Sequence, residues 1–177
     1  MPERREVKYE GKPVDEVKVY IPVFSGTNCD YDTAKAFERA GAHVATSVFC
    51  DLTADDIFAS IETMKRMIDG CHIFVLSGGF SAGDEPDGSG KFIANVLNNR
   101  KITDAIHALL DRGGLILGIC NGFQALVKSG LLPYGRLGCV GKESPTLFRN
   151  DINRHVSQIV TTRVATVNSC LLYTSDA

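Results

Sequence analysis

Apolar runs alternate with helical patterns over the first two thirds of the chain. Nearly continuous apolar runs predict buried strands over residues 17–24, 43–49, 72–79 and 114–120. Helical spacing predicts helices over 31–42, 54–70, 91–112 and 121–130, the third with a break near Asn98 and Asn99. Apolar strands alternating with helices predict an α/β fold, an open and mostly parallel sheet with helices on both faces.

Two local signals refine this outline. Thr53 is followed three residues later by Asp56, a spacing that lets the two side chains cap the start of a helix. Residues 156–167, VSQIVTTRVATV, alternate between apolar and polar positions. Such alternation predicts extra edge strands after the fourth helix, with one face in solvent.

Three loops are expected at one edge of this sheet. They are SGTNCD (25–30), SGGFSAGD (77–84) and GICNG (118–122), and each follows a predicted strand. In parallel sheets, ligands bind beyond the carboxyl ends of the strands. The sequence therefore places its candidate site on these loops.

Cys120 stands between two glycines where a strand passes into a helix. The pattern G-x-C-x-G is the thiol version of a nucleophile elbow, which holds the side chain above the sheet. The helix beginning at Asn121 directs its N–H groups at the sulfur, which favours the thiolate. The Asn121 N–H can also face an oxyanion, and the paired glycines of residues 77–81, SGGFS, permit a backbone N–H of that turn to complete the hole. A cysteine packed at an ordinary strand end is the alternative.

Composition excludes several classes of function. The 177 residues are 44% hydrophobic with a formal net charge of -2, which suits one globular domain and gives no electrostatic footprint for nucleic acid. No apolar run is long enough to span a membrane. Residues 1–16 are charged, which is unlike a signal peptide and predicts a linker or tail.

The cysteines are widely spaced and contain no C-x-x-C pair, which argues against a metal site and a compact disulfide framework. Reduced thiols in a cytoplasmic protein are expected.

Three segments resemble class I (cysteine-triad) glutamine amidotransferases, in particular the glutaminase part of phosphoribosylformylglycinamidine synthases. They are GTNCDYDTAKAFERAGA, LSGGFSAGDEPDGSGKFIANVL and GICNGFQALVKSGLLP. The resemblance covers roughly residues 17–169 and implies a flavodoxin-like glutaminase domain. ESPTLFRNDINRHVSQIV also fits the segment that follows the elbow in that family.

The resemblance implies hydrolysis of glutamine to glutamate and ammonia. Cys120 would attack the amide and form a thioester, with Asn121 and Gly79 or Phe80 as oxyanion donors and Gln124 holding the substrate. The domain itself would need no cofactor. The ammonia would pass to a synthetase domain or subunit that uses ATP and Mg²⁺ to make formylglycinamidine ribonucleotide in purine biosynthesis.

The chain departs from the family at the general base. The family places a His and a Glu two residues apart after the edge strands, and none of His43, His72, His107 and His155 has a Glu at that spacing. A structural or surface role is expected for all four. Residues 170–177 do not resemble the family's continuation and are interpreted as a non-native tail. The chain is therefore expected to be a glutaminase fragment with little activity of its own.

Two other functions stay open at this point. A PfpI/DJ-1-type cysteine hydrolase has the same elbow, but such sites place His directly after the nucleophile, where this chain has Asn121. A non-catalytic doubly wound module could bind an anion or a partner through the SGTNCD turn. The acidic run GDEPDGSG does not have calcium-loop spacing.

Overall fold

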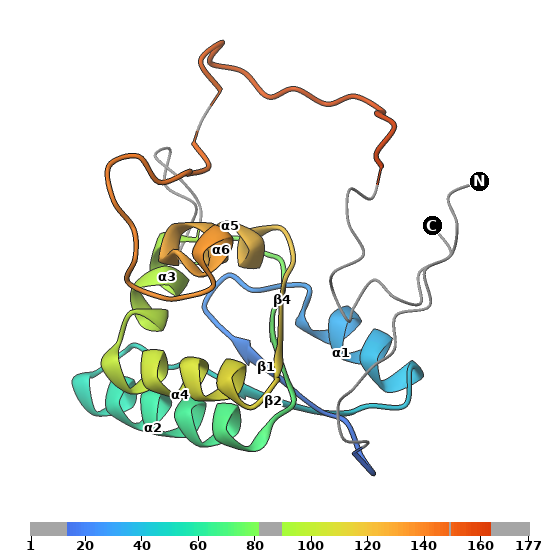
Figure 1. Ribbon diagram of the computed structural model, residues 1–177, viewed down its shortest axis with the longest axis vertical. Coiled ribbons are helices and arrows are strands. Elements are labelled where there is room, and N and C mark those ends of the chain that lie inside the picture. Colours follow the sequence, from blue (N-terminus) through green and yellow to red (C-terminus); the bar gives the residue numbers. More distant parts are fainter. Residues whose placement is uncertain (1–13, 82–89, 149, 164–177) are drawn as a thin grey trace. The chain divides into compact units, whose positions relative to one another are not determined.

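The computed structural model describes residues 14–81, 90–148 and 150–163. The chain divides into two compact units, Asp15–Arg149 and a second formed by Met1–Val14 with Asn150–Ala177. All helices and strands of the described residues belong to the first unit (Figure 1). The expected tail at 170–177 lies outside the described residues, as do the predicted linker up to residue 13 and most of the acidic run.

A four-stranded parallel sheet forms the centre of the larger unit. Its strands are β1 (Lys18–Val23), β2 (His43–Val48), β3 (Ile73–Leu76) and β4 (Leu115–Gly118), in the order β2-β1-β3-β4. All three pairings are parallel, as the continuous apolar runs predict. The chain moves outward one way from β1 and the other way from β3. The loops after these two strands therefore separate at a switch point, where α/β sheets bind ligands.

The helices begin and end close to the predicted positions. They are α1 (Asp30–Arg39), α2 (Ala54–Gly70), α3 (Lys91–Leu97), α4 (Arg100–Asp111), α5 (Asn121–Ser129) and the short α6 (Leu131–Tyr134). Thr53 and Asp56 form the predicted capping box at the start of α2. The expected break is real, because the Asn99 side chain accepts the N–H of Lys101 and starts α4 as a separate helix.

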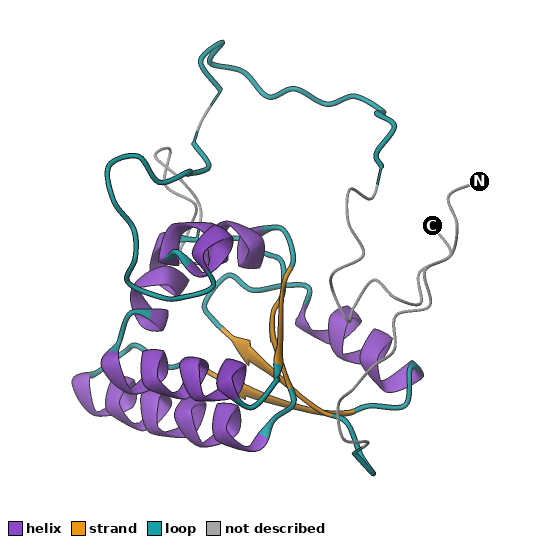
Figure 2. Ribbon diagram, in the orientation of Figure 1, coloured by secondary structure: helices purple, strands orange, loops and turns teal. Residues whose placement is uncertain are grey.

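Helices cover both faces of the sheet, as predicted (Figure 2). On one face Val19, Ile21, Ile73 and Val75 pack with Ala34 and Phe37 of α1. The other face carries the larger core, in which residues of α2, α3, α4 and α5 surround side chains such as Tyr20 and Phe74. The sheet is thus fixed from both sides, which holds the strand ends in place.

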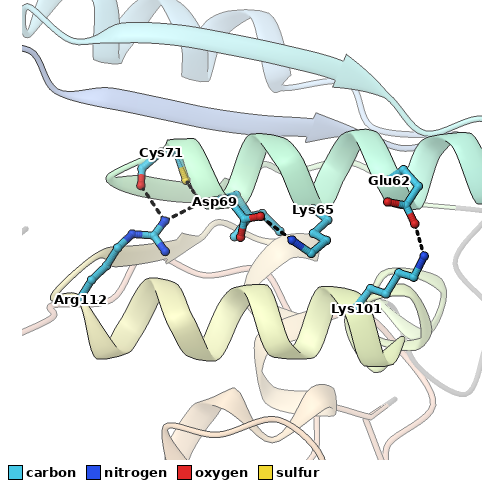
Figure 3. A network of polar contacts seen from close by, with 7 residues as sticks. Glu62, Lys65, Asp69, Cys71, Lys101 and Arg112 are labelled. Carbon is cyan, nitrogen blue, oxygen red and sulfur yellow. Dashed lines mark hydrogen bonds and ion pairs between the residues drawn. The ribbon is translucent and has the colours of Figure 1, made fainter.

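Polar contacts join α4 to α2 along the larger core (Figure 3). The Arg112 guanidinium donates to the carbonyl oxygens of Ile68 and Cys71, at 2.6 and 3.0 Å, where α2 ends. The Ile68 carbonyl also accepts the Cys71 N–H at 3.3 Å, and the arginine adds a charged donor to the carbonyls at the end of this helix. Lys101 pairs with Glu62 nearer the other end of α2, and this contact lowers the pKa of the Glu62 carboxyl.

The edge strands predicted over 156–167 are wrong for the part that the structure describes. Residues 156–163 form neither strand nor helix and are exposed, and 164–167 lie outside the described residues. Alternation makes a strand only where a neighbour completes the ladder, and the described residues contain no such pairing for this segment. Among the described helices, none is long and apolar enough to cross a bilayer.

Candidate functional site

The elbow at Cys120 has the predicted shape. Cys120 has φ 52° and ψ -108°, and it is the N-cap residue of α5. A positive φ is uncommon for a residue with a side chain, and such strain is concentrated at functional positions. The residue is exposed, which excludes the alternative of a core cysteine. The turn therefore presents the thiol to solvent at the start of a helix.

The flanking glycines are required by close backbone contacts. A Cβ at Gly122 would lie 2.0 Å from the Leu76 carbonyl oxygen of β3. A Cβ at Gly118 would lie 2.9 Å from the carbonyl oxygen of Gly122 itself. No side chain fits at such distances, so α5 sits directly on the backbone of β3. The glycines of the motif thus fix where Cys120 stands above the sheet.

The loop after β3 is held by the loop after β1. Thr27 and Gly79 form an isolated antiparallel bridge, and the Phe80 N–H donates to the Gly26 carbonyl at 2.8 Å. The N–H groups of Asn28 and Cys29 both donate to the Gly78 carbonyl at 3.3 Å. These contacts lock a glycine-rich turn beside the elbow.

The same contacts distinguish between the two predicted donors of this loop. The Phe80 N–H is already used by Gly26, so it does not face the elbow as an oxyanion donor. The Gly79 N–H makes no hydrogen bond within the part of the chain that the structure describes. Gly79 has φ 147°, and a Cβ there would lie 2.5 Å from the Gly26 oxygen. Gly79 is therefore the stronger candidate.

All three predicted loops meet at Gly78. A Cβ built on this glycine would lie 3.4 Å from Cys29 Sγ and 3.5 Å from Cys120 Cβ. The SGTNCD, SGGFSAGD and GICNG segments are thus brought together, as the topology predicts. The exposed Cys29 is a second thiol beside the elbow, which the sequence analysis did not single out.

Asn121 connects two of these loops through its side chain. It is 1% exposed, and its Oδ1 accepts the Ser81 N–H at 3.4 Å. Its Nδ2 donates to Gln124 Oε1, also at 3.4 Å. The hydroxyls of Ser77 and Ser81 are buried without a partner among the described residues. The structure thus gives Asn121 a side-chain role that the sequence did not indicate.

Two histidines have the structural roles expected of them. His72 Nδ1 accepts the Lys18 N–H at 3.0 Å, and His107 Nε2 accepts the Leu137 N–H at 3.1 Å. In each ring, one nitrogen is therefore occupied by a backbone N–H. His43 opens β2, with Nδ1 3.7 Å from a Glu16 oxygen. His155 is exposed and belongs to the other unit.

A cavity of about 480 Å³ lies at the opposite end of α5 from the elbow. Arg100, Lys128, Ser129 and Val140 are among its lining residues, and Cys120 is not. Lys128 Nζ contacts Thr146 Oγ1 and the Leu147 oxygen. Its pKa is lowered by burial and by the positive charge of Lys91. This cavity does not form part of the elbow site.

Comparisons with known proteins agree on one family. The model of the CobB/CobQ-like glutamine amidotransferase domain matches residues 16–176. The phosphoribosylformylglycinamidine synthase subunit PurQ of Dehalococcoides mccartyi is 39% identical over 120 residues, which are 68% of this chain and 43% of that protein. The subunit of the same name from Cereibacter sphaeroides is 35% identical over 153 residues, 86% of this chain and 56% of that protein.

One solved structure is also similar. It is titled "Structure of PurLQS from Thermotoga maritima", with 32% identity and a TM-score of 0.45, and the match covers 66% of this chain and 46% of that one. The chain spans about half the length of the curated relatives it matches.

Proposed function

The chain belongs to the CobB/CobQ-like glutamine amidotransferase family, and from this membership we propose that it is part of a glutaminase whose nucleophile is Cys120. The glutaminase would hydrolyse glutamine and supply ammonia for the synthesis of formylglycinamidine ribonucleotide. The names of the PurQ relatives support this assignment. One observation carries it: an exposed cysteine in a left-handed turn, fixed at the start of α5 by glycines that contact the backbone.

The proposed chemistry follows from this geometry. The Cys120 thiolate attacks the side-chain amide carbon of glutamine, and the carbonyl electrons move onto oxygen. The N–H groups of Asn121 and Gly79 stabilise that oxyanion. The amide nitrogen takes a proton and leaves as ammonia, which gives a thioester. Water then attacks the thioester, releases glutamate and returns the thiol. Gln124, one turn into α5, holds the substrate.

The proton transfers need a general base, and we propose that none of the four histidines is that base. The bonds of His72 Nδ1 and His107 Nε2 to backbone N–H groups support this for two of them. Without a base, turnover by this chain alone should be lower by about a hundredfold or more than that of a complete glutaminase. The synthetase partner, with its ATP and Mg²⁺, completes the proposed enzyme in the cytoplasm.

Labelling of the 177-residue chain with a chloroketone analogue of glutamine tests the nucleophile. We expect Cys120 to be alkylated faster than the other cysteines, because the site orients the analogue before the thiol attacks. Peptide mapping by mass spectrometry reports the rate at each thiol. Cys50 and Cys139 are exposed and serve as internal references.

Glutamine should slow the labelling of Cys120 and leave that of Cys50 unchanged, and the Cys29→Ser variant should keep the preference for Cys120. Equal rates at all exposed thiols, or no effect of glutamine, would reject the proposal. The family match favours this reading over a PfpI/DJ-1-type hydrolase and over a binding module.

A further inference from the structure

The side chain of Asn121 lies between the two parts of the proposed oxyanion hole. Asn121 opens α5, whereas Ser81 lies two residues after Gly79 in the loop that follows β3. The bond from the Ser81 N–H to Asn121 Oδ1 crosses between these segments. Because Asn121 is 1% exposed, water does not compete freely for this contact.

This contact also decides which way the Asn121 carboxamide is turned. A backbone N–H can only donate, so the atom facing Ser81 must be the oxygen. The Nδ2 group then faces Gln124, and the geometry agrees, since Nδ2 lies 3.4 Å from Gln124 Oε1. The orientation of one amide is thus dictated by the main chain of the neighbouring loop.

The orientation of the Asn121 side chain also determines that of the Gln124 side chain. Its Oε1 accepts from Asn121, so the Nε2 group, with two N–H donors, is the end left to meet a ligand. Gln124 lies four residues after Cys120, and its own N–H donates to the Cys120 carbonyl at 3.0 Å. Residues four apart share one side of a helix, which places Gln124 beside the nucleophile.

We propose that Asn121 is a positioning residue that fixes Gln124 as a hydrogen-bond donor toward an acceptor oxygen of the bound substrate. The inference rests on the proposed glutaminase function and deepens it. Asn121 then has two roles in the site. Its main chain supplies an oxyanion donor, and its side chain determines that Gln124 faces the substrate with its N–H groups. A substrate that offers a donor to Gln124 would be rejected, because two N–H groups would then face each other.

The variant Asn121→Asp tests this polarity. The new carboxylate still accepts the Ser81 N–H, but it offers Gln124 a second acceptor in place of a donor. Gln124 then turns its Nε2 toward residue 121 and presents Oε1 to the substrate. For the glutamine chloroketone we expect the concentration giving half-maximal inactivation of Cys120 to rise about tenfold or more, as for the loss of a hydrogen bond to a charged group.

Three further variants make the test specific. Gln124→Glu presents an acceptor outward without changing Asn121, and it should weaken binding of the analogue to a similar extent. In a Gln124→Leu background, Asn121→Asp should change that binding less than about twofold, because no amide remains to be turned. Asn99→Asp is the matched control, since it makes the same chemical change at the cap of α4 and should have no effect.

Alkylation by iodoacetamide separates binding from thiol exposure, because this reagent needs no substrate contacts. Its rate at Cys120 reports any effect of an added carboxylate on the thiol, and the loss of chloroketone binding should exceed that effect. The inference would be overturned if Asn121→Asp bound the chloroketone as tightly as the wild type. It would also be overturned if this substitution weakened binding equally in the presence and in the absence of Gln124. If Asn121→Asp does not fold, Gln124→Glu still tests the required donor at position 124, and wild-type binding of the chloroketone by that variant would overturn the inference. Failure of the wild-type chain to label selectively at Cys120 would instead reject the glutaminase proposal.

Discussion

At the scale of single residues, the backbone at Cys120 is the most unusual feature of the site. Its φ of 52° with ψ of -108° is a conformation that glycine adopts easily and a residue with a Cβ does not. Strain of this kind costs on the order of 1–3 kcal/mol and persists only where the surroundings impose it. Here the chain is fixed on both sides by Gly118 and Gly122. The fold therefore keeps a side chain at a position where a glycine would be more stable.

Replacing Cys120 should reveal this strain. We expect Cys120→Gly to be more stable than Cys120→Ala by about 1 kcal/mol, since glycine relieves the turn but gains freedom in the unfolded chain. Urea unfolding followed by circular dichroism measures the difference. The same pair of substitutions at the exposed Cys50, which has no positive φ, should favour alanine. A less stable glycine at both positions would show that the turn is unstrained.

The residues also show what the sequence could and could not predict. The cap at Thr53, the break at Asn99 and the elbow at Cys120 depend on neighbours within a few residues, so local patterns found them. The choice between Gly79 and Phe80 depends on the carbonyl of Gly26, more than fifty residues away. The local sequence therefore could not predict how the peptide group between Gly79 and Phe80 is oriented.

At the scale of elements, the packing of α5 against β3 determines how far Cys120 stands above the sheet. The Gly122 backbone approaches the Leu76 carbonyl so closely that no Cβ can be inserted. Contact without an intervening side chain makes the helix position insensitive to rotamer changes in the core. In contrast, residues 156–163 have a strand-like pattern but no partner among the described strands, and they stay irregular. Local pattern predicts an element only when its packing partner is present.

The variant Gly122→Ala should displace α5 from β3. The added methyl would meet a backbone oxygen at 2.0 Å, which only a shift of the helix can relieve. We expect a loss of about 2–3 kcal/mol in the free energy of unfolding and slower labelling of Cys120 by the chloroketone. Gly70→Ala is the control, because a Cβ there meets nothing within 4 Å. It should be neutral or slightly stabilising, and equal losses in both variants would contradict this account.

At the scale of the whole molecule, the core responds to pH through buried acids. Tyr20 is 1% exposed, and burial raises its pKa to about 12, although its hydroxyl bonds to Ser47 Oγ at 2.7 Å. Burial likewise raises the pKa of the Cys71 thiol to about 11. In the unfolded chain both groups ionise at lower pH. At a pH between the unfolded and the folded pKa of either group, the folded state binds more protons than the unfolded chain. The free energy of unfolding therefore falls as the pH rises through that range.

The substitution Tyr20→Phe should remove part of this alkaline loss. The variant loses a hydrogen bond at neutral pH, but it has no phenol to ionise between pH 10 and pH 12. Between pH 8 and pH 11, ionisation of Tyr20 should lower the wild type's free energy of unfolding by on the order of 1 kcal/mol. The variant should not lose this part. Urea unfolding at the two pH values measures both differences, and Cys71 contributes equally to each protein. Parallel losses in the two proteins would exclude Tyr20 as the cause.

The strand order β2-β1-β3-β4 has a consequence for when the elbow and its neighbouring loops come together during folding. Gly26, Gly79 and Cys120 lie in the loops that follow β1, β3 and β4, which are far apart in sequence and become neighbours only in the finished sheet. Parallel pairings of this range are late and slow steps of folding. In a chain that is still being synthesised, the loops around Cys120 are therefore not yet assembled, and the proposed site forms only when the last strands have paired.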